Sequence, residues 1–454
     1  MNIPLFIVLL FCLQLFYWFV GRRSSKNLKD QEDYFFAGKS VRFFPLMMTF
    51  LATQVGGGVV LGSADEAYIF GWPVLFYPLG VALGLMLLGS GIGRKLAGFD
   101  VSTVAQIFEV VYGSTGLRKL ASILSVISLF MILVAQIIAS HKFLVSIGLN
   151  HTILFVLFWA IVIIYTAQGG LRAVISTDIV QMAVFAIVFL IAFAFVMMFE
   201  PSVSLLSFPK LSQLEPVSSR MCGWILMPLL FMIIEQDMGQ RCFAGASPQI
   251  VSRASFVAGV CTLIICLVPV FFGTLAHVTN MAIPKGGSVL MTSMTQTTAP
   301  WMSALVGCAI LAAIISTATS LINAISSNLL SDFKRQETEK GASLKTVKAI
   351  TVLISIGALF FAFYFNNIVD VLIQSYELSV SCLFASIIMA LIRKRGHFKA
   401  ALLSVLLGAL GFCFFRLYPV SFPREILSLV LSFAGYGLGE AMAHYQTKVA
   451  SKAF

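Results

Sequence analysis

Two neighbouring hydroxyl side chains in an apolar segment could bind a small cation. Ser316 and Thr317 lie three and four residues after Ala313, so on a helix all three share one face. The two hydroxyls and the Ala313 carbonyl, partly freed by them, would offer three neutral oxygens, which suit a hard cation such as sodium. The alternative is structural, because serine and threonine in spanning helices often bond back to a carbonyl three or four residues earlier.

A second stretch, Leu51–Gly62, contains three consecutive glycines, Gly56 to Gly58, inside an apolar run. Each glycine costs a helix about 1 kcal/mol relative to alanine. Unwound backbone at membrane depth survives only where protein or a water-filled cavity surrounds it. We therefore predict a discontinuous spanning helix that aims free carbonyls at an ion or solute. Two such carbonyls, with the three oxygens near Ser316, would complete a five-coordinate neutral site; the alternative is a glycine face for close helix packing.

Three acidic residues also fall within predicted spans. Glu235 and Asp237 end the seventh span, and Glu377 lies in the eleventh. Burying a carboxylate near the bilayer centre costs several kcal/mol, so such residues usually face a cavity or a partner. For Glu235 the sequence leaves open contact with a solute or a salt bridge near the inner surface. For Glu377 it favours a solvated or paired structural role.

Three further acids have simpler expected roles. Asp65 and Glu66 are expected at the outer mouth of the second span, exposed to solvent. Asp178 follows Thr177 at the expected start of the sixth span, where capping of the helix N-terminus is the default explanation.

The composition requires a membrane environment for these elements. Of 454 residues, 59% are hydrophobic and 11% charged, against about 25% charged in a soluble domain. Long apolar runs, without the alternation of a barrel, predict an all-α integral membrane protein with about thirteen spanning helices. The expected spans are Ile3–Val20, Phe43–Ala64, Trp72–Gly93, Leu120–Ile147, Ile153–Ala167, Asp178–Phe199, Met221–Met238, Ser255–His277, Ala304–Leu330, Val347–Phe365, Ile368–Ile392, Ala400–Phe415 and Ile426–Ala443.

The basic residues indicate an orientation. With the N-terminus outside, about 24 of the 30 Lys and Arg residues fall in cytoplasmic connections, as the positive-inside rule requires. The net charge of +11 is therefore read as a topology signal and not as a nucleic-acid surface. The first apolar run precedes its basic residues, which predicts a spanning helix and not a cleavable signal. We expect a multi-pass protein of the cell inner membrane with a cytoplasmic C-terminus.

Four separated motifs resemble those of the sodium:solute symporter family, in the same order over residues 30 to 395. They are the loop Asp33–Ser40, the segment Gly169–Gln181, the pair Gln240-Arg241, and Ala312–Thr317. This resemblance implies the inverted-repeat fold of the bacterial leucine transporter, with two inverted five-helix repeats and discontinuous second and seventh helices around a midplane site. The expected divisions are residues 1–42 (first helix and cytoplasmic loop), 43–199 (first repeat), 200–393 (second repeat) and 394–454 (two C-terminal helices and a short tail).

The resemblance also implies roles for particular residues. The family's sodium site falls here on the carbonyls of Ala52, Val55 and Ala313 and the hydroxyls of Ser316 and Thr317. Asp178 matches a family aspartate linked to sodium release on the cytoplasmic side. The expected solute residues are Gln54, Gly56, Gly57, Phe231 and Glu235.

The second helix resembles most closely that of the high-affinity choline transporter branch. That branch cages its quaternary ammonium with tryptophans, by cation–π attraction. Gln54 and Glu235 stand at the corresponding positions here. They predict a solute with hydrogen-bonding groups, such as an amino acid or another small polar metabolite, and they disfavour choline. The proline and sugar symporter branches remain alternatives.

The sequence thus predicts a sodium-coupled secondary active symporter that imports a small organic solute across the lipid bilayer by alternating access. It shows no nucleophile–base pair and no nucleotide loop, so we expect no enzyme activity, and we expect no obligate protein partner. One alternative is proton coupling through Glu235 or Asp237. A membrane sensor that binds a solute is another, although the longest non-spanning pieces are only about twenty residues. A channel is less favoured, because no repeated pore loop is present.

Overall fold

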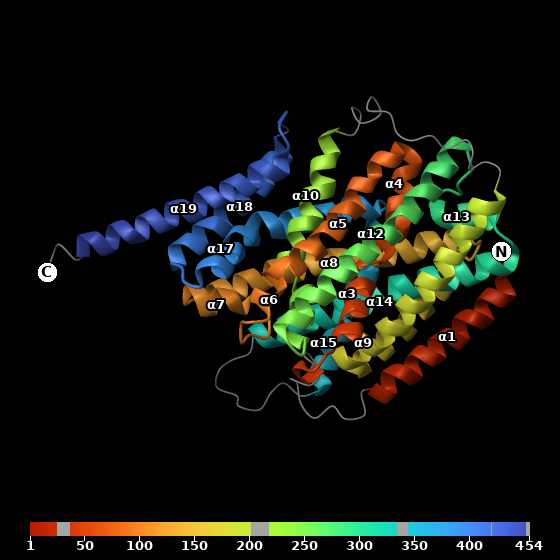
Figure 1. Cartoon of the computed structure of the whole chain (residues 1–454), viewed down its shortest axis with the longest axis horizontal. Coiled ribbons are helices and arrows are strands. Elements are labelled where there is room, and N and C mark those ends of the chain that lie inside the picture. The colour runs from red at the N-terminus through yellow and green to blue at the C-terminus, as the bar shows by residue number, and fades with distance from the viewer. Residues whose placement is uncertain (25–36, 201–217, 334–343, 419, 451–454) are drawn as a thin grey trace.

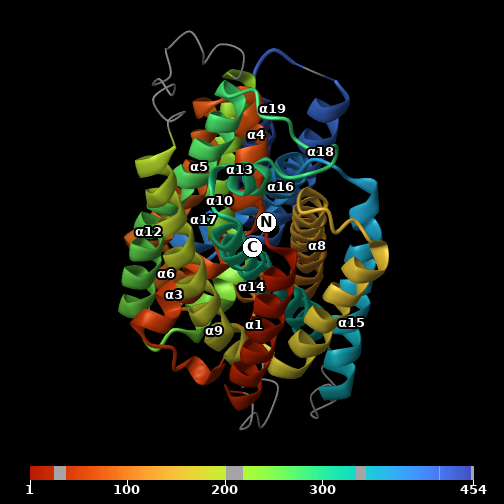
Figure 2. The same ribbon diagram turned by 90° about the vertical axis from the view of Figure 1, so that its right-hand side faces the viewer.

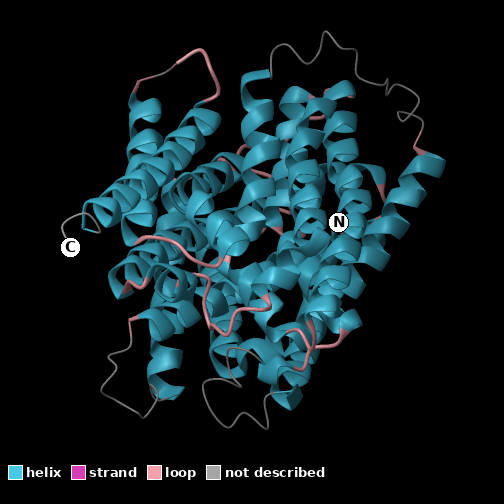
Figure 3. Ribbon diagram, turned by 60° about the vertical axis from the view of Figure 1, so that its left-hand side comes forward, coloured by secondary structure: helices cyan, strands magenta, loops and turns pink. Residues whose placement is uncertain are grey.

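The computed structural model describes residues 1–24, 37–200, 218–333, 344–418 and 420–450, and within these ranges it is helical apart from loops and an isolated bridge between Val41 and Gly245 (Figure 3). Three short elements are π-helical (η2, η4, η9) and three are 3-10 turns (η1, η3, η8). The elements are α1 (Ile3–Ser24), η1 (Ala37–Lys39), α3 (Phe43–Gln54), η2 (Gly58–Gly62), α4 (Ser63–Phe70), η3 (Trp72–Leu75), α5 (Phe76–Leu87), η4 (Leu88–Ile92), α6 (Gly93–Leu96), α7 (Gln106–Tyr112), α8 (Thr115–Ser146), α9 (Thr152–Phe199), α10 (Ser218–Ile234), α11 (Gln236–Ala244), α12 (Pro248–Val278), α13 (Val289–Thr297), α14 (Pro300–Asp332), α15 (Leu344–Phe361), η8 (Ala362–Tyr364), α16 (Ile368–Ser379), η9 (Val380–Phe384), α17 (Ala385–Arg393), α18 (Phe398–Leu417) and α19 (Arg424–Ala450).

The apolar helices lie where the sequence predicts spans. Within the described ranges, nine are long and apolar enough to cross a membrane, and two bent pairs raise this number to eleven. The bent pairs are Phe43–Gln54 with Gly58–Phe70 and Arg220–Ile234 with Gln236–Ala244, which are the two spans expected to be discontinuous. Two shorter apolar helices, Thr152–Ile164 and Lys348–Tyr364, occupy the remaining two expected positions. The full count of thirteen crossings stays a prediction.

Helix α14 forms the centre of the molecule. It packs against α8, α9, α1, α3 and α11, and 94% of its most apolar stretch is buried inside the protein. In the first helix, α1, only 11% of that stretch is buried, so α1 presents most of its surface outward. In Figure 1, α18 and α19 pack together at the end of the molecule opposite α1, and Figure 2 shows α1 beside α14. The hydroxyl-bearing part of α14 is thus buried inside the protein.

The segment Gly169–Gln181 bends α9 at Gly170, whose φ of 60° and ψ of −173° lie outside the helical region and favour glycine. The second half of the helix therefore begins at Gly170 and runs to Phe199. Asp178 lies about two turns inside it. The expectation that Asp178 caps a helix N-terminus is wrong, because the backbone amides around it are already bonded within the helix.

The expectation that Asp65 and Glu66 are simply solvated is also wrong. Lys142 Nζ lies 2.5 Å from Asp65 Oδ2, and the Val289 amide donates to Asp65 Oδ1 at 2.9 Å. Glu66 is 3% exposed and accepts from Asn367 Nδ2 at 2.9 Å, with Arg220 Nη1 3.7 Å away. These contacts tie the second half of the broken helix, Gly58–Phe70, to α8, α10, the start of α13 and the loop before α16.

The structural role expected for Glu377 fits its surroundings. Its buried carboxylate lies 3.5 Å from Arg424 Nε and 3.7 Å from Arg416 Nη2. The repeat divisions and the outside N-terminus stay predictions. Several residues used in the topology argument lie outside the described ranges, as do residues 33–36 of the Asp33–Ser40 motif; these are Lys26, Lys29, Lys210, Lys334, Arg335, Lys340 and Lys452.

Candidate functional site

The first break follows Gln54, the last residue of α3. Val55 has φ −85° and ψ 69°, so its carbonyl leaves the helical direction, and a π-helical turn begins at Gly58. The two halves of the helix meet at a bend of 52°. All residues from Ala52 to Gly62 are buried. The chain therefore unwinds inside protein, as backbone polar groups in a membrane require.

Close packing explains why this break is built from glycines. A Cβ atom on Gly56 would lie 2.3 Å from Thr317 Oγ1, and one on Gly57 would lie 2.5 Å from Ala139 Cβ. Real Cβ atoms essentially never come so close to a neighbour. The glycines therefore do both things that the sequence suggested: they break the helix, and they allow close packing against its neighbours. Only glycine lets the unwound backbone approach α8 and α14 to this extent.

The hydroxyls of α14 reach the carbonyl exposed by the break. Ser316 Oγ lies 3.0 Å from Ala52 O, and Thr317 Oγ1 lies 3.1 Å from the same oxygen. The two hydroxyls also lie 2.8 and 3.3 Å from Ala313 O in their own helix. The bond back to the same helix and the contact across to the broken helix thus occur together. The structure brings Ala52, Ala313, Ser316 and Thr317 into one cluster.

This cluster has the chemistry of a sodium site. Two carbonyl oxygens and two hydroxyl oxygens lie within hydrogen-bond distance of one another, and the Val55 carbonyl belongs to the adjoining turn. All five residues are at least 96% buried. Neutral, hard oxygen donors fit an alkali cation, and a rotation of the two hydroxyl hydrogens would turn their lone pairs toward it. A bound sodium would supply the positive charge that links the two helices.

A glutamine side chain satisfies the other backbone group at the break. The Gly57 amide donates to Gln136 Oε1 at 2.7 Å, and Gln136 is 2% exposed in the middle of α8. Our sequence reasoning missed this residue. A lone amide side chain within a long apolar span is the signal that could have identified it, because buried polar groups in lipid require partners.

The second break leaves a carboxylate at the joint between two helices. Glu235 has extended backbone (φ −65°, ψ 125°) between α10 and α11, and the two helices meet at 45°. The seventh span therefore does not end at Glu235 and Asp237, as the sequence suggested, but continues to Ala244. Gln54 Nε2 donates to Glu235 Oε2 at 3.0 Å, which joins the two broken helices.

A small buried cavity separates the two breaks. It has a volume of about 20 Å³ and is lined by residues that include Gln54, Gly56 and Glu235, together with Thr317 and Gln136. This volume is enough for about one water molecule, so the site is closed to an organic solute in this conformation. The Gly57 N–H donates a hydrogen bond to Gln136, which lines the cavity, whereas the ring of Phe231 stacks on Tyr376 at a centroid distance of 4.6 Å. Tyr376 and Tyr77 line the cavity, and our sequence reasoning missed both.

A buried ionic network lies one helical turn from the oxygen cluster. Arg241 is fully buried and contacts both Asp178, at 3.4 Å, and Asp237. Its guanidinium also donates to Thr49 O and to Ser320 Oγ, and Thr49 Oγ1 donates to Asp178 Oδ2 at 2.5 Å. The Gln240-Arg241 motif thus supplies the cation that holds α3, α9, α11 and α14 together.

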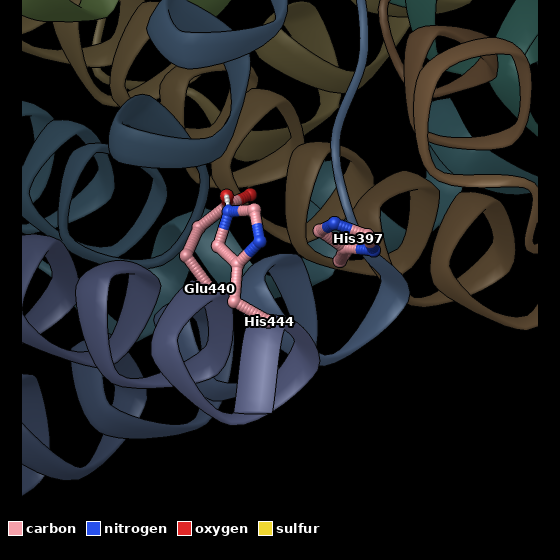
Figure 4. Close-up of side chains that lie close together, drawn as sticks. All are labelled: His397, Glu440 and His444. Atoms are coloured by element: carbon pink, nitrogen blue, oxygen red, sulfur yellow. Dashed lines mark ion pairs between the residues drawn. The ribbon is translucent and has the colours of Figure 1, made fainter. Parts of the chain in front are cut away.

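A different group of ligating side chains lies at the C-terminal end. His397, Glu440 and His444 place one ligand atom each within 4.8 Å of the others (Figure 4). Both histidines are exposed, and the carboxylate of Glu440 already has Arg393 Nη1 at 3.5 Å. This cluster belongs to α19 and the loop before α18, away from both breaks.

Comparisons with known proteins agree with this arrangement. Residues 34–408 match the model of the sodium:solute symporter family. A high-affinity choline transporter 1 from Drosophila melanogaster is 25% identical over 287 residues, which are 61% of this chain and 45% of the relative. A sodium/pantothenate symporter from Haemophilus influenzae is 30% identical over 156 residues, which are 33% of this chain and 32% of the relative. The matches thus span less than half the length of these relatives.

Solved structures show the fold. A Na+-coupled sialic acid symporter, in a substrate-bound outward-open state, superposes with a TM-score of 0.79 at 16% identity and covers 96% of both chains. MhsT in complex with L-phenylalanine superposes with a TM-score of 0.62 at 12% identity, over 88% of this chain and 98% of MhsT. The expected fold class, an all-α inverted-repeat transporter with discontinuous helices, is confirmed. The two broken helices and the family match over residues 34–408 together show that this chain belongs to the sodium:solute symporter family.

Proposed function

We propose that this protein is a sodium-coupled secondary active symporter that imports a small polar organic solute, such as an amino acid or a similar metabolite, by alternating access. The observation that carries the proposal is the contact of Ser316 and Thr317 with Ala52 O at the first break. Sodium is assigned to Ala52, Val55, Ala313, Ser316 and Thr317. On this proposal the protein lies in the cell inner membrane, with its N-terminus outside and its C-terminus in the cytoplasm.

The solute is assigned to the neighbouring cavity. Gln54, Gly56 and Glu235 line it directly, Gly57 borders it, and Phe231 supports the ring of Tyr376 from behind. Thr317 belongs both to the oxygen cluster and to the cavity wall. A ligand at either place thus orders the same turn of α14, and this shared element is the physical basis of positive coupling between ion and solute.

Asp178 is assigned a role in ion release. Through Thr49 and Arg241 it touches α3, α11 and α14 one turn from the oxygen cluster. A change in its pairing with Arg241 would loosen the inner ends of these helices together. The closed cavity of about 20 Å³ requires some such rearrangement, because a solute of several heavy atoms cannot enter it as it stands.

Uptake by purified protein in liposomes tests this function. Radiolabelled amino acids, sugars, pantothenate and choline are supplied with an inward sodium gradient, with an equal potassium gradient, or with a proton gradient alone. Sodium-dependent accumulation of at least one solute is expected, and Ser316→Ala with Thr317→Val should abolish it. Accumulation that follows the proton gradient and ignores sodium would instead support proton coupling through Glu235 or Asp237. Binding of a solute without accumulation would support a sensor.

A further inference from the structure

Buried charges around the two breaks do not balance. Among the described residues of this region, Asp178, Glu235 and Asp237 are at least 96% buried, and Arg241 is the basic side chain that pairs with the two aspartates. Three carboxylates against one guanidinium leave a deficit of two positive charges when all are ionised. Carboxylates without counter-charges are costly to bury in protein. In the ionised state, two of the three carboxylates therefore need a further positive group in contact with them, and without one they must bind a proton.

Arg241 cannot serve as the partner of Glu235. Its Nε donates to Thr49, its Nη1 to Asp237, and its Nη2 to Ser320 and toward Asp178. These contacts use the donors of the guanidinium. The proposed sodium accounts for one missing charge, at the oxygen cluster next to this network. Glu235, on the cavity wall, is left for the other.

The hydrogen-bonding pattern on the cavity wall defines what the second cation must offer. Gln54 Nε2 donates to Glu235 Oε2, so the carbonyl oxygen of Gln54 and the second oxygen of Glu235 remain as acceptors. Two acceptors on residues that line one cavity match a group with several N–H donors. A quaternary ammonium has none, and a sugar hydroxyl brings no charge.

We propose that Glu235 is the counter-ion of the transported solute, and that this solute carries a protonated primary or secondary amine that also donates to Gln54. The inference rests on the proposed function and narrows its substrate class. The aromatic rings of Tyr77 and Tyr376 line the same cavity and cover the less polar part of such a solute. The amine-bearing class includes free amino acids and simple alkylamines, and it excludes choline and N-acylated analogues.

The test compares the uptake of matched solutes into liposomes under an inward sodium gradient. Ethanolamine and L-alanine are set against N-acetylethanolamine and N-acetyl-L-alanine, with choline and D-glucose as further probes. Sodium-driven uptake is expected for amine-bearing members and not for their N-acetyl counterparts. Glu235→Gln should lower kcat/KM for the amine by roughly 10- to 100-fold, the range for losing a hydrogen bond to a charged group. Stabilisation of the variant by sodium alone, measured by thermal unfolding, should remain.

The matched control is Glu440→Gln, which removes a carboxylate from the C-terminal helix and should leave uptake unchanged. Sodium-driven uptake of the N-acetyl compounds, choline or D-glucose without uptake of the amines, or uptake of an amine that survives Glu235→Gln, would show the inference to be wrong while the proposed function stands. If neither these probes nor any solute of the wider panel above accumulates under a sodium gradient, the proposed function fails, and this inference fails with it. Loss of sodium stabilisation in Glu235→Gln would show a structural role for Glu235 and would also overturn the inference.

Discussion

The two helix breaks in this protein differ in the residues that form them and in the polar groups that they present. The first, between Gln54 and Gly58, uses glycines, and its exposed carbonyl meets hydroxyls of α14. The second has a single extended residue, Glu235, and presents a carboxylate. A backbone that offers neutral oxygens can coordinate a bare cation without adding a fixed negative charge of its own. A buried carboxylate instead needs a positive partner, so on our proposal the ion binds at the first break and the charged part of the solute at the second.

The largest expected effect concerns the network beside the second break. Arg241→Leu leaves Asp178 and Asp237 buried without a counter-charge, which costs about 3–5 kcal/mol when one partner of a buried pair is removed. We expect little folded protein, measured as the monodisperse fraction in detergent. The triple variant Arg241→Leu, Asp178→Asn, Asp237→Asn should recover folded protein, because neither aspartate position then carries a charge that lacks a partner.

The control for this variant is Arg393→Leu, because Arg393 is half exposed and its pairing with Glu440 is worth at most about 1 kcal/mol. Normal folding of Arg241→Leu alone would mean that the carboxylates do not depend on this guanidinium, and the contrast between the two breaks would weaken.

The next effect concerns the glycines of the first break. Gly56→Ala places a methyl group 2.3 Å from Thr317 Oγ1 and 2.8 Å from Gln136 Oε1, so α14 and the break must separate. We expect folded protein that has lost sodium-driven uptake. In Gly437→Ala the new methyl group has no atom within 4 Å, and uptake should be normal. Full activity of Gly56→Ala would contradict a tight ion site at this break.

A smaller effect is expected when a single hydroxyl is removed from the oxygen cluster. Thr317→Val keeps the shape of the side chain but removes one proposed ligand, and we expect the sodium concentration for half-maximal uptake to rise roughly tenfold, equivalent to about 1.4 kcal/mol. Thr317→Ser should restore it. Thr262→Val provides the matched control, since the Thr262 hydroxyl donates to Ala258 O within its own helix. An equal shift in Thr262→Val would point to general destabilisation.

The smallest effect is expected outside both breaks. Lys142→Met removes the ion pair that holds the second half of the first broken helix to α8. The pair is partly exposed, so its loss is worth about 1 kcal/mol or less. We expect the apparent sodium affinity to change by at most about fivefold, measured from the sodium dependence of uptake. A complete loss of uptake would show that this contact, and not the oxygen cluster, controls the broken helix.

The sequence by itself determined the membrane class, the discontinuous second span, and the shared helix face of Ala313, Ser316 and Thr317. These features follow from local chemistry: long apolar runs require lipid, three glycines interrupt a helix, and a spacing of three and four residues sets one face. The family motifs added the inverted-repeat fold and the break in the seventh span. Such inferences need no knowledge of which distant segments meet.

The partners of each polar group were decided only by the tertiary structure. Asp178 was misassigned as a helix cap because nothing near it in sequence reveals Arg241, 63 residues away. Asp65 and Glu66 were misassigned as solvated because Lys142 and Asn367 reach them from distant helices. For the same reason the sequence did not identify Gln136 and Tyr376 as residues of the site. A buried polar group is stabilised by whichever complementary group the packing brings within about 3 Å, and that pairing is a property of the folded arrangement of helices.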